Sequence, residues 1–196
     1  MNVLKFGGTS VGSKHGILNI YEIVKKELAK NPGLLVVVSA FSGVTNYLVQ
    51  LAKQAELNDT EFHSTFEKIK ERHFSMVDEL FLQKEGNNIK QEVGVTLNEL
   101  RNIALGVNMI HDLSKKTLDN IMSFGERLSA YIITEYFKKN GFKTSLLDAR
   151  QIIKTDKNYG SANVKLKETK ENTDKYFAKN KNLVIMTGFI GSTLDN

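Results

Sequence analysis

A lysine followed at once by a run of small residues is the first feature of this chain that could do chemistry. Lys5 lies in the short apolar stretch Val3-Leu4-Lys5-Phe6, and the segment from Gly7 to Ser13 has almost no side-chain bulk. Glycines let backbone N–H groups converge on an anion, and a helix that follows adds its first amides. The Lys5 ammonium adds a mobile positive charge. This pattern is typical of a phosphate site, although a tight turn between strand and helix uses the same residues.

The segment from Gly7 to Lys14 comes close to a P-loop, G-x-x-x-x-G-K-[ST], but departs from it at the end. After Gly12 the order is Ser13-Lys14-His15, so the lysine falls one place late. No Ser or Thr follows it to bind magnesium. The sequence therefore excludes the P-loop class of nucleotide-binding proteins.

Two further loops of small and polar residues accompany strand-like runs. One is residues 39–46, which begins within the end of the apolar run 34–40. The other is residues 187–192, which begins at the last residue of the run 183–187. In parallel sheets ligands bind beyond the carboxyl ends of the strands, so the sequence predicts that all three loops meet at one edge. Each loop can also be interpreted as ordinary turn chemistry. In the segment 39–46, Thr45 would then simply cap the next helix.

A glutamate in Ser123-Phe124-Gly125-Glu126-Arg127 is the candidate for recognising a positively charged group. The pattern predicts a helix from about Ser123 to Lys139, with Glu126 in its first turn. An acid there ordinarily interacts with the helix dipole, and the functional alternative is a fixed carboxylate that binds an ammonium group. Asp148 and Asp156 could orient a ligand or only a turn. The four histidines lack ligand-like spacing, so we expect no metal site.

Apolar periodicity predicts the elements that position these residues. Strand-like runs occupy residues 3–6, 34–40, 143–147 and 183–187. From about residue 59 to 113 apolar residues recur with a period near 3.6, which indicates a helical insertion, broken around residues 85–88. Strands that alternate with helices favour an α/β sandwich with a mostly parallel sheet.

The composition limits the class of protein. A chain of 196 residues with 41% hydrophobic content can form one domain, since domains run to about 100–200 residues. The 27 basic residues are interspersed with 22 acidic ones, which does not favour nucleic-acid binding. The chain has no cysteine, no signal-peptide pattern and no apolar run near the roughly 18 residues of a membrane span. We therefore expect a cytoplasmic protein that binds neither nucleic acid nor membrane.

Four motifs together closely resemble the aspartate kinases of the amino acid kinase family. They are Lys5-Phe6-Gly7-Gly8-Thr9-Ser10-Val11, Ser42-Gly43-Val44-Thr45-Asn46, Ser123-Phe124-Gly125-Glu126-Arg127-Leu128-Ser129 and Thr187-Gly188-Phe189-Ile190-Gly191-Ser192. The K-F-G-G-T-S opening is specific to aspartokinases within the family. The resemblance extends from the first predicted strand to the last.

The resemblance implies an αβα sandwich that transfers the γ-phosphoryl group of MgATP to the side-chain carboxylate of L-aspartate. The product, 4-phospho-L-aspartate, leads to lysine, threonine, methionine and isoleucine. ATP and Mg²⁺ are the implied cofactors, and L-aspartate is the implied substrate. By family position Lys5 neutralises charge on the transferring phosphoryl group. The implied phosphate-binding residues are Lys5, Gly7, Gly8 and Ser10, and the implied aspartate-binding residues are Ser39, Thr45, Glu126 (which faces the ammonium) and Phe189.

The sequence departs from the family pattern on its C-terminal side. Aspartokinases carry a G-R-G-G-S-D motif soon after the last of these segments, then an adenine-binding stretch and ACT domains. None of these is in the sequence. The resemblance therefore implies residues 1–196 to be the N-terminal portion of a kinase domain, C-terminally incomplete, from an enzyme that forms a homo-oligomer. Two alternatives stay open: another amino acid kinase, such as a glutamate or uridylate kinase, or a non-catalytic binding or regulatory module.

Overall fold

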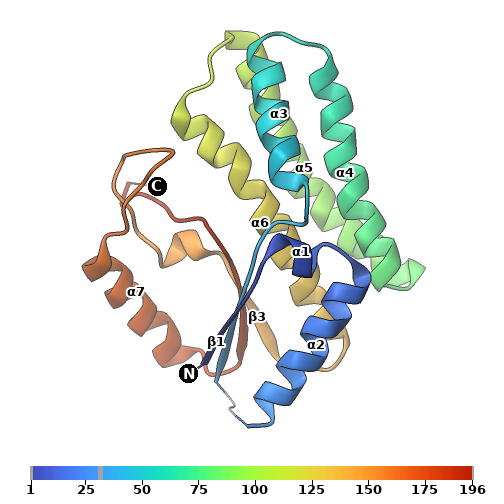
Figure 1. The fold of residues 1–196 in the computed structure, drawn as a ribbon, viewed down its shortest axis with the longest axis vertical. Helices are drawn as coiled ribbons and strands as arrows, with labels where there is room; N and C mark the ends of the chain where they lie inside the picture. Colours follow the sequence, from blue (N-terminus) through green and yellow to red (C-terminus); the bar gives the residue numbers. More distant parts are fainter. Residues whose placement is uncertain (1, 31–32, 196) are drawn as a thin grey trace.

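The computed structural model describes residues 2–30 and 33–195 (Figure 1). Its strands are β1 (Asn2–Phe6), β2 (Leu34–Val38), β3 (Thr144–Leu147) and β4 (Leu183–Thr187). Its helices are α1 (Gly8–Val11), α2 (Lys14–Leu28), α3 (Val44–Glu56), α4 (Glu61–Leu80), α5 (Gln83–Ile110), α6 (Lys115–Lys139) and α7 (Leu166–Lys179), with a 3₁₀ helix, η1 (Ala149–Gln151).

The four strands form one parallel sheet in the order β1-β2-β4-β3. The register pairs Phe6 with Val38, and Val38 with Thr187. Since the strands are parallel, the segments that follow these three residues emerge at the same edge. The predicted parallel α/β fold is confirmed, and the second strand ends at Val38, two residues earlier than expected.

Helices cover both faces of the sheet, as the alternation of side chains along a strand requires. Leu34, Val36 and Val38 belong to the larger core, which includes side chains of α2 and α6. Leu35 and Val37 belong to a smaller cluster that includes Tyr176 and Phe177 of α7. In Figure 1 α7 lies on one side of the strands and α2 on the other. The architecture is thus an αβα sandwich.

Helices α3, α4, α5 and α6 pack together beyond one end of the sheet, in the upper part of Figure 1. The helical insertion is confirmed, but its break was predicted wrongly. The chain turns at Phe81 and Leu82, which both have extended backbones, and α5 continues through residues 85–88. A glycine inside a helix costs about 1 kcal/mol, which tertiary packing can outweigh. Gly86 is buried against Val77 and Phe81.

Helix α6 begins eight residues before the predicted start at Ser123. Its N-cap is Ser114, whose hydroxyl accepts a hydrogen bond from Thr117 N at 3.1 Å. This is ordinary N-cap chemistry, and the exposed residues Lys115 and Lys116 form part of the first turn of the helix. Glu126 therefore lies near the middle of α6 and not in its first turn.

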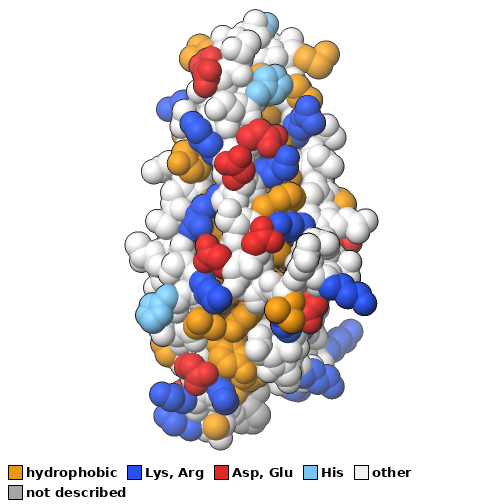
Figure 2. Space-filling view, turned by 90° about the vertical axis from the view of Figure 1, so that its right-hand side faces the viewer, with side chains coloured by type: hydrophobic (Ala, Val, Ile, Leu, Met, Phe, Trp, Pro, Cys, Tyr) orange, Lys and Arg blue, Asp and Glu red, His pale blue; other side chains and the backbone are white. Residues whose placement is uncertain are grey.

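The surface of the helical part carries both signs of charge. Figure 2 shows Lys and Arg side chains interspersed with Asp and Glu over the upper part of one face, and hydrophobic side chains gathered lower down. None of the helices described here combines the length and the apolar composition that a membrane-spanning helix requires.

Candidate functional site

A cavity of about 1370 Å³ lies beyond the carboxyl ends of the strands. Its walls include α1, the segment after β2, the segment after β4, the N-terminal half of α6 and part of the loop between η1 and α7. The predicted convergence of three small-residue loops at one edge is confirmed. Five of the predicted site residues line this cavity: Gly8, Ser39, Thr45, Glu126 and Phe189.

Glycines allow the segment after β1 to pack closely against the segment after β2. A Cβ at Gly8 would lie 3.0 Å from Ala40 O, and a Cβ at Gly12 would lie 2.9 Å from Ser42 Cβ. The segment forms a single turn of helix, α1, and Ser13 then caps α2 by accepting a hydrogen bond from Gly16 N at 3.1 Å. Close backbone packing therefore holds the two loops against each other.

Lys5 lies at the edge of the cavity. It is exposed, and the register places it beside Val37, which lines the cavity wall. Its Nζ lies 5.4 Å from the centroid of the Phe189 ring and would be 3.8 Å from a Cβ at Gly7. Within residues 2–30 and 33–195 no carboxylate forms an ion pair with it. The ammonium is thus available to an anion beside the glycine segment.

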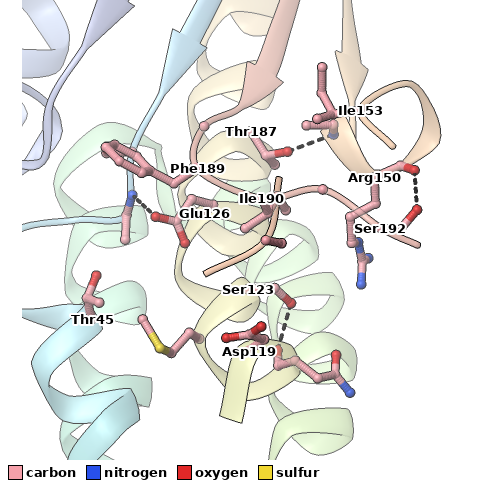
Figure 3. A pocket seen from close by; sticks show the side chains of 18 of the residues that line it. Thr45, Asp119, Ser123, Glu126, Arg150, Ile153, Thr187, Phe189, Ile190 and Ser192 are labelled. Carbon is pink, nitrogen blue, oxygen red and sulfur yellow. Dashed lines mark hydrogen bonds between the residues drawn. The ribbon is translucent and has the colours of Figure 1, made fainter. Parts of the chain in front are cut away.

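Phe189 combines an unusual backbone with an unusual exposure. Its φ is 56°, in the left-handed region that large side chains rarely adopt, and its side chain is 86% exposed. Such conformations cost about 1–3 kcal/mol and cluster at ligand sites. In Figure 3 its ring lies at the rim of the cavity, on the side of β2.

Glu126 supplies a buried carboxylate to the cavity (Figure 3). The residue is 7% exposed, and its Oε1 accepts a long hydrogen bond, 3.4 Å, from Ala40 N. Burial raises the pKa of this carboxyl group, and the backbone hydrogen bonds oppose the shift only in part. The helix-dipole interpretation is wrong, because Glu126 lies far from the first turn of α6.

A glycine beside Glu126 brings α6 against the loop after β2. A Cβ at Gly125 would lie 2.8 Å from Ala40 Cβ and 3.2 Å from Leu48 Cδ1. One turn later, Ser129 donates a hydrogen bond from Oγ to Ser39 O at 2.7 Å. These two contacts fix Glu126 relative to Ser39 and Ala40.

Thr45 is the second residue of α3 and does not cap it. The N-cap is Gly43, with a φ of 84° and no side-chain cap, so the capping interpretation is wrong. Thr45 is half-buried and lines the cavity instead. Thr45 thus lines the same cavity as Glu126 and Phe189, and the three side chains are drawn together in Figure 3.

Three of the predicted site residues lie outside the cavity wall. Lys5 and Gly7 lie at its edge, and Ser10 is exposed on α1. The two other candidate acids, Asp148 and Asp156, form hydrogen bonds within their own turns. Asp148 pairs with Arg150 at 2.6 Å and caps η1. Asp156 accepts hydrogen bonds from the Asn163 side chain and from the backbone of Asn158 and Asn163, which lower its pKa. The turn interpretation therefore holds for both acids.

Sequence reasoning missed Asp119 and Arg150, which also line the cavity. Asp119 Oδ2 accepts a hydrogen bond from Gly160 N at 2.8 Å and so ties the loop before α7 to α6. The signal was the capping serine, Ser114. A helix that starts there places Asp119 and Glu126 seven residues apart, on the same face.

No group of three or more His, Cys, Asp or Glu among the described residues could hold a metal ion. The amino acid kinase family matches residues 1–196. The chain belongs to the amino acid kinase family.

Among curated relatives of this family member, the bifunctional aspartokinase/homoserine dehydrogenase of Daucus carota is 30% identical over 202 residues. The match covers 100% of this chain and 21% of the carrot protein. The aspartokinase of Chlamydia muridarum is 30% identical over 191 residues, with 97% of this chain and 40% of that protein covered. The chain thus spans less than half the length of either relative.

Solved structures of E. coli aspartokinase III have the same fold. The T-state complex with lysine and aspartate matches with a TM-score of 0.88 at 27% identity, over 99% of this chain and 42% of that one. The R-state complex with aspartate and ADP matches with a TM-score of 0.86 and the same identity and coverage. Both bacterial structures contain an amino acid, and the second also contains a nucleotide.

Proposed function

We propose that this chain forms the acceptor- and phosphate-binding part of an aspartate kinase, which transfers the γ-phosphoryl group of MgATP to the side-chain carboxylate of L-aspartate. The observation that carries the proposal is the Glu126 carboxylate, buried at the wall of a cavity that Gly8 of the glycine segment also lines. All curated relatives described above are aspartokinases.

The acceptor side of the cavity suits a small zwitterion. The Glu126 carboxylate is buried in a residue that is 7% exposed, and its hydrogen bond from Ala40 N is 3.4 Å long, so its charge is only partly compensated. An ammonium group that binds it would restore the lost solvation. We assign Glu126 to the aspartate ammonium. Ser39 and Thr45 offer further polar contacts, and Phe189 closes the rim.

The glycine segment suits the phosphates of ATP. Gly7 and Gly8 carry no side chain that would keep an anion from the backbone, Ser10 adds an exposed hydroxyl, and the Lys5 ammonium lies beside them without an acidic partner among the described residues. Mg²⁺ is expected to arrive with the nucleotide, since it prefers phosphate oxygens and water to an all-protein cage.

The reaction needs charge neutralisation more than proton transfer. The attacking group is a carboxylate, which is already an anion, so no general base is required. The obstacle is repulsion between that carboxylate and the phosphate. Lys5 is placed to stabilise the charge on the transferring phosphoryl group, and the fixed loops hold the two reactants in position.

We propose that residues outside this chain complete the site. The chain spans 21% to 42% of the relatives described above, and no adenine pocket is assigned within it. An arginine for the substrate carboxylate, the adenine-binding half, the ACT domains and homo-oligomer formation are all assigned to the remainder of a longer, cytoplasmic protein.

Hydroxylamine trapping of aspartyl phosphate tests the proposal. We expect the full-length protein to form hydroxamate only when both MgATP and L-aspartate are present, and residues 1–196 alone to form none. Positioning of both substrates contributes about 7–11 kcal/mol to such a reaction, so half a site should be inactive. Glutamate is assayed in the same way, and uridylate by formation of ADP, because phosphorylated uridylate is not an acyl phosphate and gives no hydroxamate. A preference for another acceptor, or binding without turnover in the full-length protein, would reject aspartate kinase activity.

A further inference from the structure

An arginine of the helical layer reaches both loops that the proposed reaction depends on. Arg72, on α4, donates a hydrogen bond from its guanidinium group to Gly12 O, at the end of the glycine segment. The same guanidinium lies over the ring of Phe41, 5.7 Å from its centroid, in the loop after β2. Arg72 is 60 residues from Gly12 in sequence, so this contact exists only in the folded chain.

The two loops that Arg72 joins already touch each other. Gly8 packs on Ala40 O and Gly12 packs on Ser42, at the separations given above. A small shift of the glycine segment would therefore be transmitted to the loop that carries Ser39, and to Glu126, which accepts its hydrogen bond from Ala40 N. The phosphate side and the acceptor side form one packed unit.

Phe41 anchors this unit in the core. Phe41 is 1% exposed. The ring of His73, which follows Arg72 on α4, packs against the Phe41 ring with the two centroids 5.4 Å apart. His73 is itself fully buried, and its Nδ1 lies 2.7 Å from Ile69 O, a hydrogen bond that fixes the orientation of the ring. Arg72 and His73 thus hold Phe41 from consecutive positions of one helix.

We propose that Arg72 is a positioning residue that sets the distance between the glycine segment (residues 7–13) and the loop after β2 (residues 39–43), an inference that rests on the proposed function. Neither Arg72 nor Gly12 lines the cavity, so the guanidinium acts from behind the loop and does not touch a substrate. By binding the Gly12 carbonyl it holds that oxygen outside the cavity, where it does not oppose a phosphate. A planar donor that also stacks on an aromatic ring is a task for arginine, which lysine meets only in part.

The test compares Arg72→Met and Arg72→Lys in the full-length protein. Methionine keeps a flexible apolar stem over Phe41 and removes the donor, whereas lysine keeps one donor. Arg101→Met is the matched control, since Arg101 is an exposed arginine of the same helical layer. Equilibrium binding of Mg·ADP and of L-aspartate is measured separately, together with kcat, both KM values and the thermal unfolding midpoint.

We expect Arg72→Met to weaken the binding of both ligands by roughly tenfold, as for the loss of one charged hydrogen bond, and to lower kcat. Arg72→Lys should lose less, and Arg101→Met should match the wild type. Unchanged affinity for either ligand would overturn the inference, as would a loss of activity fully explained by a smaller folded fraction with both KM values unchanged. Failure of the wild type to phosphorylate aspartate would reject the proposed function instead. This result comes from the wild type alone and is therefore distinct from any effect of the Arg72 variants.

Discussion

The buried histidine of α4 makes the stability of this chain sensitive to acid. His73 is fully buried, and desolvation lowers its pKa from 6.5 to about 4, an effect that its hydrogen bond to Ile69 O opposes only in part. Its Nε2 has no hydrogen-bond partner among the described atoms, so a proton placed there would be buried without compensation. Unfolding exposes the ring to water and restores the ordinary pKa.

The sign and size of the effect follow from linkage. As the pH falls below 6.5 the unfolded chain takes up a proton that the folded chain refuses until the pH nears 4, so the contribution to stability is present above pH 6.5 and lost between 6.5 and 4. At about 1.36 kcal/mol for each pH unit, the loss reaches about 3 kcal/mol. That is a large fraction of the stability of an ordinary domain, about 5–15 kcal/mol.

Urea unfolding of residues 1–196 at a series of pH values between 7 and 4 measures this contribution. Carboxylates also titrate in this range, so the relevant quantity is the difference between the wild type and His73→Leu, which cannot take up the proton. We expect the stability of the wild type to fall by about 3 kcal/mol more than that of His73→Leu. His15→Gln, at an exposed histidine, serves as the control and should follow the wild type. Parallel pH profiles for the wild type and His73→Leu would refute the reasoning.

Three further substitutions test the site. Gly125→Ala should destabilise the chain by about 1–3 kcal/mol despite the better helix propensity of alanine, because the added Cβ would lie 2.8 Å from Ala40 Cβ. Gly94→Ala is the control and should be neutral or slightly stabilising, because open space surrounds Gly94 in α5. Equal urea midpoints for the two variants would contradict the packing argument. In the full-length protein, Glu126→Gln should raise the aspartate KM by roughly tenfold or more. Because burial raises the Glu126 pKa, wild-type aspartate affinity should fall as the pH is lowered through that pKa, whereas Glu126→Gln should show a flatter profile; titration calorimetry with equal pH dependence in both would remove Glu126 from the ammonium site. Lys5→Ala should lower kcat by about 10²–10³ with a modest change in aspartate KM, and a variant within threefold of the wild-type kcat would exclude the role in transfer.

Local patterns predicted the sheet well. β1 and β4 coincide with their apolar runs to within one residue, and β2 and β3 lie within theirs. Buried parallel strands read as continuous apolar runs, so the signal is contained in each strand itself. The boundaries of the long helices were less predictable. Two helix starts depended on details that periodicity does not record, namely the cap at Ser114 and the turn at Phe81 and Leu82.

The sequence was sufficient to predict that three loops of glycine or other small residues meet at one edge of a parallel sheet, because this depends only on strand direction and chain order. It also singled out Glu126 and Lys5 by residue type. The surroundings of these two residues became visible only in the folded chain. The place of Glu126 at the wall of the cavity comes from Gly125, which lets α6 approach Ala40, and the contact of Arg72 with Gly12 spans 60 residues. Such contacts depend on how helices pack on one another and on the loops. The periodicity of apolar residues along the sequence does not indicate which distant segments come into contact.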